Sequence, residues 1–308
     1  MKNMFLCPVC KIGAINLNTE EYLCDNNECR TIYSTINNIP VLINFNKSLL
    51  DKEVLFNNNG ISQIKRNNNL IIKVFKKILF GNGENTQKNI QFISKKLREL
   101  KSVKILIVGG GSIGSGLDSF YKEFKNSIDS FDIYYSPFID FIADAHSIPI
   151  KDNYYDFIIL QAVLEHVLDP IVVVDECYRV LKNDGFIYSE TPFMQQVHEG
   201  AYDFTRFTNS GHRNLFNRFY HIKSGANAGV GTTLLWGISY FMFGVFRSKK
   251  IKIFTRCLFF WLRYFDMIVP EKFNIDGASG NYFIGQKDIS FKYSFKAIVN
   301  FYQGSQKK

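Results

Sequence analysis

The chain has 308 residues, which is enough for about two domains of ordinary size and for hydrophobic cores that need no disulfide bonds. Hydrophobic residues make up 46% and charged residues 21%, which are ordinary globular proportions and exclude a disordered, collagen-like or heptad-repeat chain. With 37 basic and 28 acidic side chains, the net charge is +9. This charge favours polyanions or anionic membrane surfaces as partners but does not identify a particular one.

The first residues, 1–6, contain one lysine and no apolar run, so they do not predict a signal peptide and we expect a cytoplasmic protein. Four of the six cysteines fall within the first 29 residues. This clustering favours a local metal site over a framework of disulfide bonds.

These cysteines form two close pairs, which are Cys7 with Cys10 and Cys24 with Cys29. The spacing predicts one tetrahedral zinc ion whose four thiolate ligands leave no position for water, so the site is structural. The alternative interpretation is four free thiols in an irregular segment. With the strand-like run 39–43 that follows, the segment resembles the zinc ribbons of the family that activates tRNA methyltransferases, and we expect a zinc-ribbon-like domain over residues 1–45.

Residues 46–102 have the pattern of a helical linker between two domains. Apolar residues at helical spacing over 71–79 predict one amphipathic helix, and those over 90–100 predict a second that leads into the main domain.

A glycine-rich turn follows the apolar strand-like run 103–108. Gly109 permits the tight turn, Gly111 lets a ligand approach the backbone, and Gly114 precedes a helical pattern that runs through Phe124. A strand, a glycine turn and a helix N-terminus together predict a nucleotide-binding cradle, although such turns also occur without a ligand.

Strand-like and helical segments then alternate, as a doubly wound sheet requires. Strands are predicted over 127–133, 138–143, 155–160 and 185–189. Asp169 and Pro170 predict the start of a helix between the last two strands. The apolar face expected for this helix consists of Ile171, Val174, Tyr178 and Leu181.

Acidic residues after the second and third strands suit an adenosine cofactor. Asp132 lies 18 positions after Gly114, where a carboxylate can accept hydrogen bonds from both ribose hydroxyls, as in NAD sites. Asp144 and Ala145 follow the third strand, and the sequence Leu-Glu-His at 164–166 follows the fourth. With the "Arg-Val-Leu-Lys-Asn-Asp-Gly" run, these motifs resemble a class I S-adenosylmethionine-dependent methyltransferase over about 103–226.

The resemblance implies an α/β Rossmann-like fold, with a seven-stranded doubly wound sheet whose last strand, 281–285, is antiparallel. It places the methyltransferase domain at 103–288, with a helical insertion at 227–270 and a basic C-terminal tail at 289–308. S-adenosylmethionine would be held by Gly109, Gly111, Gly114, Asp132, Asp144, Ala145 and Gln161. One departure is Ile107, which stands where family members often carry an acid, and the third glycine comes one residue late.

Candidate catalytic residues lie in two places. His166 could act as a general base, or the Glu-His pair could only organise its loop. In the segment after the fifth strand, His198 could be the base, oriented by Asp203, while Arg206 holds an anionic acceptor. The alternative is an Asp203–Arg206 pair that only pins the loop, and His212 with Arg213 would add positive charge nearby.

The acceptor is a small molecule or glycan in the interpretation we favour, which is O-methylation of a sugar or similar metabolite in surface-polysaccharide biosynthesis. RNA is the alternative acceptor, since the ribbon and the +9 charge suit it, and a catalytically silent scaffold is a third hypothesis. The apolar and basic residues 234–270 predict a lid, a dimer face or a shallow contact with the inner membrane surface. The sequence does not fix the oligomeric state.

Overall fold

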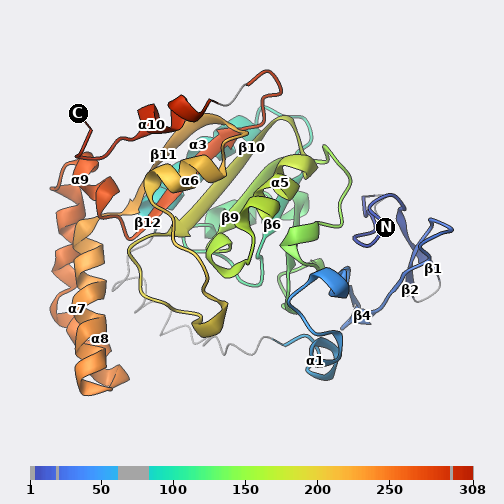
Figure 1. The fold of residues 1–308 in the computed structure, drawn as a ribbon, viewed down its shortest axis with the longest axis horizontal. Coiled ribbons are helices and arrows are strands. Elements are labelled where there is room, and N and C mark those ends of the chain that lie inside the picture. Colours follow the sequence, from blue (N-terminus) through green and yellow to red (C-terminus); the bar gives the residue numbers. More distant parts are fainter. Residues whose placement is uncertain (1–3, 19–20, 62–82, 292–293, 308) are drawn as a thin grey trace.

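The computed structural model describes residues 4–18, 21–61, 83–291 and 294–307. A seven-stranded sheet forms its centre, in the order β11-β12-β10-β9-β6-β7-β8 (Figure 1). The strand β12 runs antiparallel to both its neighbours, and β10, β9, β6, β7 and β8 are parallel. The strands of the sheet are β6 (Ile105–Val108), β7 (Ile128–Asp132), β8 (Phe141–Ile142), β9 (Tyr155–Gln161), β10 (Leu181–Pro192), β11 (Tyr220–Ala228) and β12 (Gly280–Gln286). The predicted α/β class and the antiparallel last strand are confirmed.

The central strand β6 is buried along its whole length because helices cover both faces of the sheet. Ile105 and Ile107 pack in one core with α3 (Glu84–Leu97) and α4 (Asp118–Glu123). Leu106 and Val108 pack in the other core with α5 (Pro170–Val180) and with residues of and after α6 (Asn209–Leu215). A strand with two buried faces reads as a continuous apolar run, which is why the sequence predicts it.

The remaining described helices lie outside these two layers. They are α1 (Lys52–Asn57), α7 (Val230–Phe246), α8 (Lys249–Leu258), α9 (Glu271–Asp276) and α10 (Phe295–Phe301). The helix predicted over 71–79 lies outside the described residues. The second predicted linker helix corresponds to α3, which begins six residues earlier than its pattern, at Glu84.

Several predicted elements differ in detail. Asp169 caps α5 by accepting hydrogen bonds from the amides of Ile171 and Val172, as expected. Its predicted apolar face is partly wrong, because Ile171 is 64% exposed and the helix buries Val173, Cys177 and Val180 beside the expected Val174. The helix after the glycine turn starts only at Asp118, so the turn does not lead directly into a helix N-terminus.

Strand lengths differ as well. The third strand, β8, contains only Phe141 and Ile142, and it is shorter than the predicted 138–143. The fifth, β10, extends from Leu181 to Pro192 and has an irregular register between Leu181 and Phe186. The turn expected around Asp184 therefore lies inside this strand, where Asp184 has a φ of 62°.

The N-terminal segment forms two small sheets, one of β1 (Ile15–Asn18), β2 (Glu21–Cys24) and β3 (Ile32–Tyr33), the other of β4 (Thr35–Ile36) and β5 (Ile39–Pro40). Figure 1 shows it beside the β8 end of the large sheet. The amide of Leu6 donates to Pro149, the Phe5 ring meets Phe141 with a centroid distance of 5.3 Å, and the amide of Leu42 donates to Ile142. The N-terminal segment therefore shares a hydrophobic core with the sheet.

The insertion before the last strand consists of α7, α8 and the 3-10 helix Phe260–Met267. It stands at the end of the molecule opposite the N-terminal segment (Figure 1). Asp266 accepts hydrogen bonds from the amides of Gly231 and Thr232 and from the Thr232 hydroxyl, so it caps the start of α7 from a neighbouring turn. In the part of the chain that the structure describes, no helix combines the length and apolar character that a membrane crossing needs.

We expect Phe5→Ala to lower the free energy of unfolding by about 3–5 kcal/mol, because a buried aromatic side chain is lost from the core that joins the N-terminal segment to the sheet. Denaturant unfolding followed by far-ultraviolet circular dichroism measures this, and Leu17→Ala is the control, since Leu17 is 50% exposed on β1. A Phe5→Ala protein whose sheet domain unfolds at the wild-type denaturant concentration would contradict the shared core.

Candidate functional site

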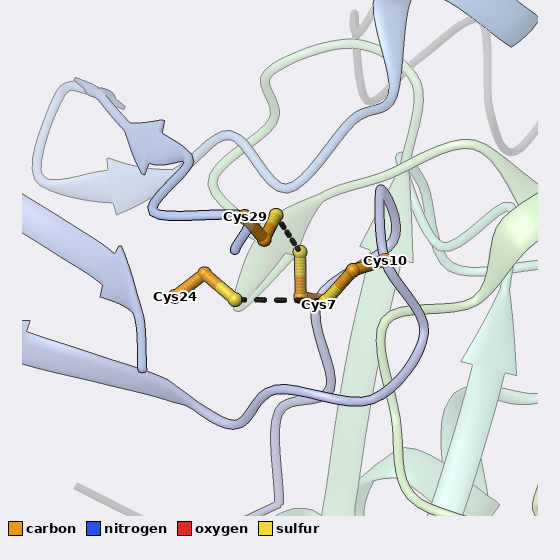
Figure 2. A group of neighbouring side chains, drawn as sticks. All are labelled: Cys7, Cys10, Cys24 and Cys29. Carbon is orange, nitrogen blue, oxygen red and sulfur yellow. Dashed lines mark hydrogen bonds between the residues drawn. The ribbon is translucent and has the colours of Figure 1, made fainter. Parts of the chain in front are cut away.

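The four N-terminal cysteines converge on one point (Figure 2). Their sulfur atoms all lie within 4.8 Å of one another, and the Cys7–Cys29 and Cys10–Cys24 sulfur distances are both 3.7 Å. Zn–S bonds of about 2.3 Å put the sulfurs of a tetrahedral site about 3.8 Å apart. The amide of Gly13 donates to the Cys10 sulfur, and the Tyr33 hydroxyl lies 2.9 Å from the Cys7 sulfur. The donor set therefore fits a structural zinc ion, as the sequence predicts.

A cavity of about 530 Å³ opens at the carboxyl ends of β6, β7 and β9. Gly109 forms its floor with a φ of +73°, and a Cβ there would lie 2.4 Å from Val163. At Gly114, a Cβ would lie 1.7 Å from the Gln161 side-chain oxygen. A side chain at Gly109 would be strained by the positive φ and would clash with Val163, whereas one at Gly114 would displace the Gln161 side chain from the cavity wall.

Asp132 ends β7 and lines this cavity. Its carboxylate accepts a hydrogen bond of 2.9 Å from the amide of Gly111, which holds the glycine turn against the next strand. Gly111 itself is not part of the cavity wall, so it contributes to the site only by the hydrogen bond that its amide donates to Asp132. Gln161 donates to the carbonyl of Ser115 and to Glu190, while its buried oxygen has no hydrogen-bond partner among the described residues. A carboxylate beside an unpartnered amide oxygen suits an adenosyl ligand with ribose hydroxyls and an amino group.

Asp144 and Ala145 also line the cavity, as predicted from the sequence. One Asp144 oxygen accepts from the Ser48 hydroxyl at 2.5 Å, and the other accepts from the His146 amide at 2.9 Å. The Nδ1 atom of His146 also lies 2.6 Å from the second oxygen. Only the oxygen that accepts from Ser48 has a further lone pair, and this one can accept from an adenine amine. Ser48, with the two leucines after it, brings the linker into the cavity wall.

A second cavity of about 260 Å³ adjoins the first. The two share Ser115, Gln161, Ala162, Glu190 and His198 in their walls. The second is closed on one side by Thr232 and Trp236 of α7, so the insertion forms part of its wall. Four of its lining residues carry buried polar atoms that lack a hydrogen-bond partner within the described chain, namely Gln161, Glu165, Thr191 and Asn227.

Two histidines and a glutamate meet at the border of these cavities. His166 and His198 line the first cavity, and His198 and Glu165 line the second. The two imidazole rings are 4.9 Å apart between centroids. Burial raises the pKa of the Glu165 carboxyl to about 7, and burial together with His166 lowers the pKa of His198. An imidazole that is neutral at neutral pH therefore lies beside the first cavity.

Asp203 and Arg206 lie behind His198 and not in the cavity wall. Asp203 receives two hydrogen bonds from the Arg206 guanidinium, which lower the pKa of its carboxyl to about 2. Arg206 also donates to the carbonyls of Gln195 and Thr205. Since its donors are engaged within the protein, this geometry favours the loop-pinning interpretation over capture of an anionic acceptor by Arg206.

The positive charge expected from the Gly-His-Arg segment is not at the site. His212 and Arg213 are buried in α6, and the Arg213 guanidinium donates to the carbonyl of Phe216 and lies 5.6 Å from the Phe283 ring centroid. The sequence prediction was wrong here because the aromatic side chains around α6 provide a buried surface on which the guanidinium stacks.

Sequence reasoning missed Ser48, Glu190 and Trp236 in the cavity walls and gave Glu165 no ligand-facing role. Glu190 accepts hydrogen bonds from Thr86 at 2.5 Å and from Gln161 at 2.8 Å, and burial raises the pKa of its carboxyl. The position of Glu190 in its strand could have identified it from the sequence. Glu190 is a buried ionisable residue near the carboxyl end of a strand, and such groups often belong to a site.

The fold and the cavity define an α/β protein with a nucleotide-type site at the carboxyl edge of its sheet. A family model described as a methyltransferase domain matches residues 122–189. These residues include β7, β8, β9 and α5, and the match supports a methyltransferase domain in this part of the chain. A search of curated proteins finds no match.

Solved structures with a similar fold include a candidate sarcosine dimethylglycine methyltransferase of Galdieria sulphuraria, with 17% identity, 65% of this chain and 86% of that chain covered and a TM-score of 0.42. The [4+2]-cyclase SpnF has 12% identity, coverages of 66% and 81% and a TM-score of 0.41. Phosphoethanolamine N-methyltransferase 2 of Haemonchus contortus, in complex with S-adenosyl-L-methionine, has 14% identity, coverages of 69% and 56% and a TM-score of 0.44. Similarities at this level carry no argument about the activity of this chain.

We expect the purified protein to contain about one zinc ion per chain, and Cys24→Ser to lose it and to melt at a lower temperature. Zinc-finger peptides bind zinc with about 10–16 kcal/mol, and that free energy supports folding. Elemental analysis and thermal unfolding measure both effects. Cys257→Ser is the matched control, because Cys257 lies on α8 outside the cluster. Wild-type protein that is fully folded without zinc would contradict the prediction.

Proposed function

We propose that this protein is an S-adenosylmethionine-dependent methyltransferase whose acceptor is a hydroxyl group of a sugar or a similar small metabolite. The observation that carries this proposal is the pair of adjoining cavities. One is bordered by the glycine turn and Asp132, and the other contains unpartnered polar atoms. Glycans and metabolites of surface-polysaccharide biosynthesis belong to this acceptor class.

The larger cavity is the proposed cofactor site. Asp132 would hold the ribose hydroxyls, Asp144 and Ala145 would face the adenine, and the backbone at Gly109 would border the methionine part. When bound, S-adenosylmethionine supplies an electrophilic methyl group on a sulfonium ion. The protein's own task is to align the acceptor and exclude water.

The smaller cavity is the proposed acceptor site. Its volume of about 260 Å³ is near the lower limit of small-molecule pockets, about 300–1,000 Å³. The side-chain oxygens of Gln161, Glu165 and Asn227 are hydrogen-bond acceptors without donors in the described structure, so they match the donating hydroxyls of a polyol. Trp236 adds an aromatic surface on which the apolar face of a sugar ring can pack.

Proton removal from the acceptor is assigned to His198. Its Nδ1 lies 3.3 Å from an oxygen of Asp203, which stays ionised because Arg206 holds it. This contact favours the tautomer with the proton on Nδ1, in which Nε2 can accept the proton of an acceptor hydroxyl. His166, whose Nδ1 lies 2.7 Å from the Tyr202 carbonyl, is the second candidate.

RNA is the alternative acceptor, and the net charge of +9 favours it. The N-terminal ribbon does not require RNA as an explanation, because its residues pack into the core beside β8. A catalytically silent scaffold is the third alternative, and cofactor binding without methyl transfer would support it.

We expect S-adenosylhomocysteine at a hundredfold excess over its dissociation constant to stabilise the folded protein by about 2.7 kcal/mol, and NADH to have no effect. Asp132→Ala should weaken the affinity by about tenfold or more, because hydrogen bonds to a carboxylate contribute about 1.5–3 kcal/mol. Thermal unfolding measures the stabilisation by each ligand, and isothermal titration calorimetry measures the affinity. Asp175→Ala is the control, since Asp175 forms an exposed pair with Arg218. Equal affinity in the Asp132→Ala protein would contradict the assigned site.

Trp236→Ala should raise KM for the acceptor by about tenfold and leave the affinity for S-adenosylhomocysteine unchanged, because Trp236 lines only the second cavity. The assay follows transfer of a labelled methyl group to a panel of monosaccharides, nucleotide sugars and RNA. Tyr240→Ala, an exposed aromatic position further along α7, is the control. Label found only in RNA would contradict the proposed acceptor class.

A further inference from the structure

Glu165 is a buried carboxylate without a hydrogen-bond partner. Its side chain is 1% exposed, and neither oxygen accepts a hydrogen bond from any residue that the structure describes. Two imidazole nitrogens face its Oε1, namely Nε2 of His166 at 3.7 Å and Nε2 of His198 at 4.0 Å. Burying a carboxylate without a hydrogen-bond partner costs free energy. A cation in contact with Glu165 would offset this cost.

The two histidines are oriented by their other ring nitrogens. Nδ1 of His166 lies 2.7 Å from the carbonyl oxygen of Tyr202, and only a protonated Nδ1 can donate to that oxygen. Nδ1 of His198 lies 3.3 Å from the carboxylate of Asp203, whose two oxygens are also held by Arg206. These contacts favour the proton on Nδ1 in each ring, and each Nε2 then keeps a lone pair within 4.0 Å of the Glu165 Oε1. Histidine ligands of metal ions are commonly fixed by such carbonyl and carboxylate partners.

The three ligand atoms lie within 4.8 Å of one another. Bonds of about 2.0–2.2 Å to an ion would place neighbouring ligand atoms about 3.0–3.6 Å apart, so small side-chain movements close the site. Two imidazoles and one carboxylate on one side of an ion leave its other positions open, which is typical of divalent transition metals that bind a further ligand.

We propose that Glu165, His166 and His198 bind a divalent transition metal ion, of the Mn²⁺, Fe²⁺, Co²⁺ or Zn²⁺ class, at the border of the two cavities. Asp203 and Arg206 are positioning residues that orient His198. This site is separate from the cysteine cluster, whose four ligands close the coordination of its ion.

The ion would have its open positions facing the cavities that His198 and His166 line. An acceptor hydroxyl bound there would have a lowered pKa and would lie beside the cofactor cavity. This consequence rests on the proposed function, whereas binding of the ion does not. With the ion bound, the lone pair on Nε2 of His198 holds the metal. The lowered pKa of the bound hydroxyl then replaces the general-base role that the proposed function gives to His198 in the metal-free protein.

The experiment titrates Co²⁺ into full-length protein whose cysteine cluster is loaded with zinc. Co²⁺ bound by nitrogen and oxygen gives visible d–d absorption bands, whereas exchange into the cysteine cluster adds intense thiolate charge-transfer bands. We expect one equivalent of Co²⁺ to bind without thiolate bands. Glu165→Gln and His198→Ala should each weaken this binding by at least tenfold, and Asp203→Asn by about 10–100-fold.

Glu123→Gln is the matched control, because Glu123 pairs with Arg98 on the surface and should bind Co²⁺ like wild type. Melting temperatures show whether each variant folds, and His198→Ala is the less disruptive ligand variant because its side chain is 32% exposed. Absence of Co²⁺ binding by the zinc-loaded protein at millimolar concentration, or equal binding by both ligand variants, overturns the proposal.

Calorimetry with S-adenosylhomocysteine on the same samples separates this proposal from the proposed function. Cofactor binding without Co²⁺ binding overturns only the metal site. Co²⁺ binding that is lost in the ligand variants supports the site even if the cofactor does not bind.

Discussion

The burial of β6 on both faces is the constraint on which the rest of the structure depends. All four residues of this strand are buried, so helices must cover the sheet above and below. The carboxyl ends of β6, β7 and β9 are then left at the edge of the sheet, where the chain leaves each strand in a loop. The cavity, the glycine turn and Asp132 all lie at this edge, outside the carboxyl ends of the strands.

Two additions to the sheet form the walls that the loops do not. The N-terminal segment packs beside β8, and the start of the linker that follows it contributes Ser48 to the larger cavity. The insertion packs at the other end and contributes Thr232 and Trp236 to the smaller one. Each addition therefore packs against the sheet and lines one of the two cavities. The packing of either addition does not require a nucleic acid or a membrane.

Much of this was predictable from the sequence because it depends on local patterns. Buried parallel strands are continuous apolar runs, and residues that follow such strands meet at one edge, so the pattern was enough to predict that Gly109 and Asp132 lie together. Gln161 was added by the resemblance to methyltransferases. Positions that depend on packing across the fold could not be predicted. Arg213 is buried by aromatic rings from distant segments, and Ser48 comes from a polar stretch without periodicity.

Glu165 illustrates the same limit at the site itself. A glutamate in a short turn is expected to face water, and only the tertiary structure shows it buried between two histidines. The cysteine cluster was the opposite case, since its ligands are close in sequence and their spacing alone predicted their convergence.

The hydrogen bond from Ser48 to Asp144 links two parts of the molecule that differ in what holds them together. Asp144 belongs to the sheet, whereas Ser48 is joined through a few residues to strands that have little core apart from the cysteine cluster and the contact with β8. Oxidation of those thiols would disturb the strands that lead to Ser48, and it would therefore change the wall of the larger cavity at Asp144.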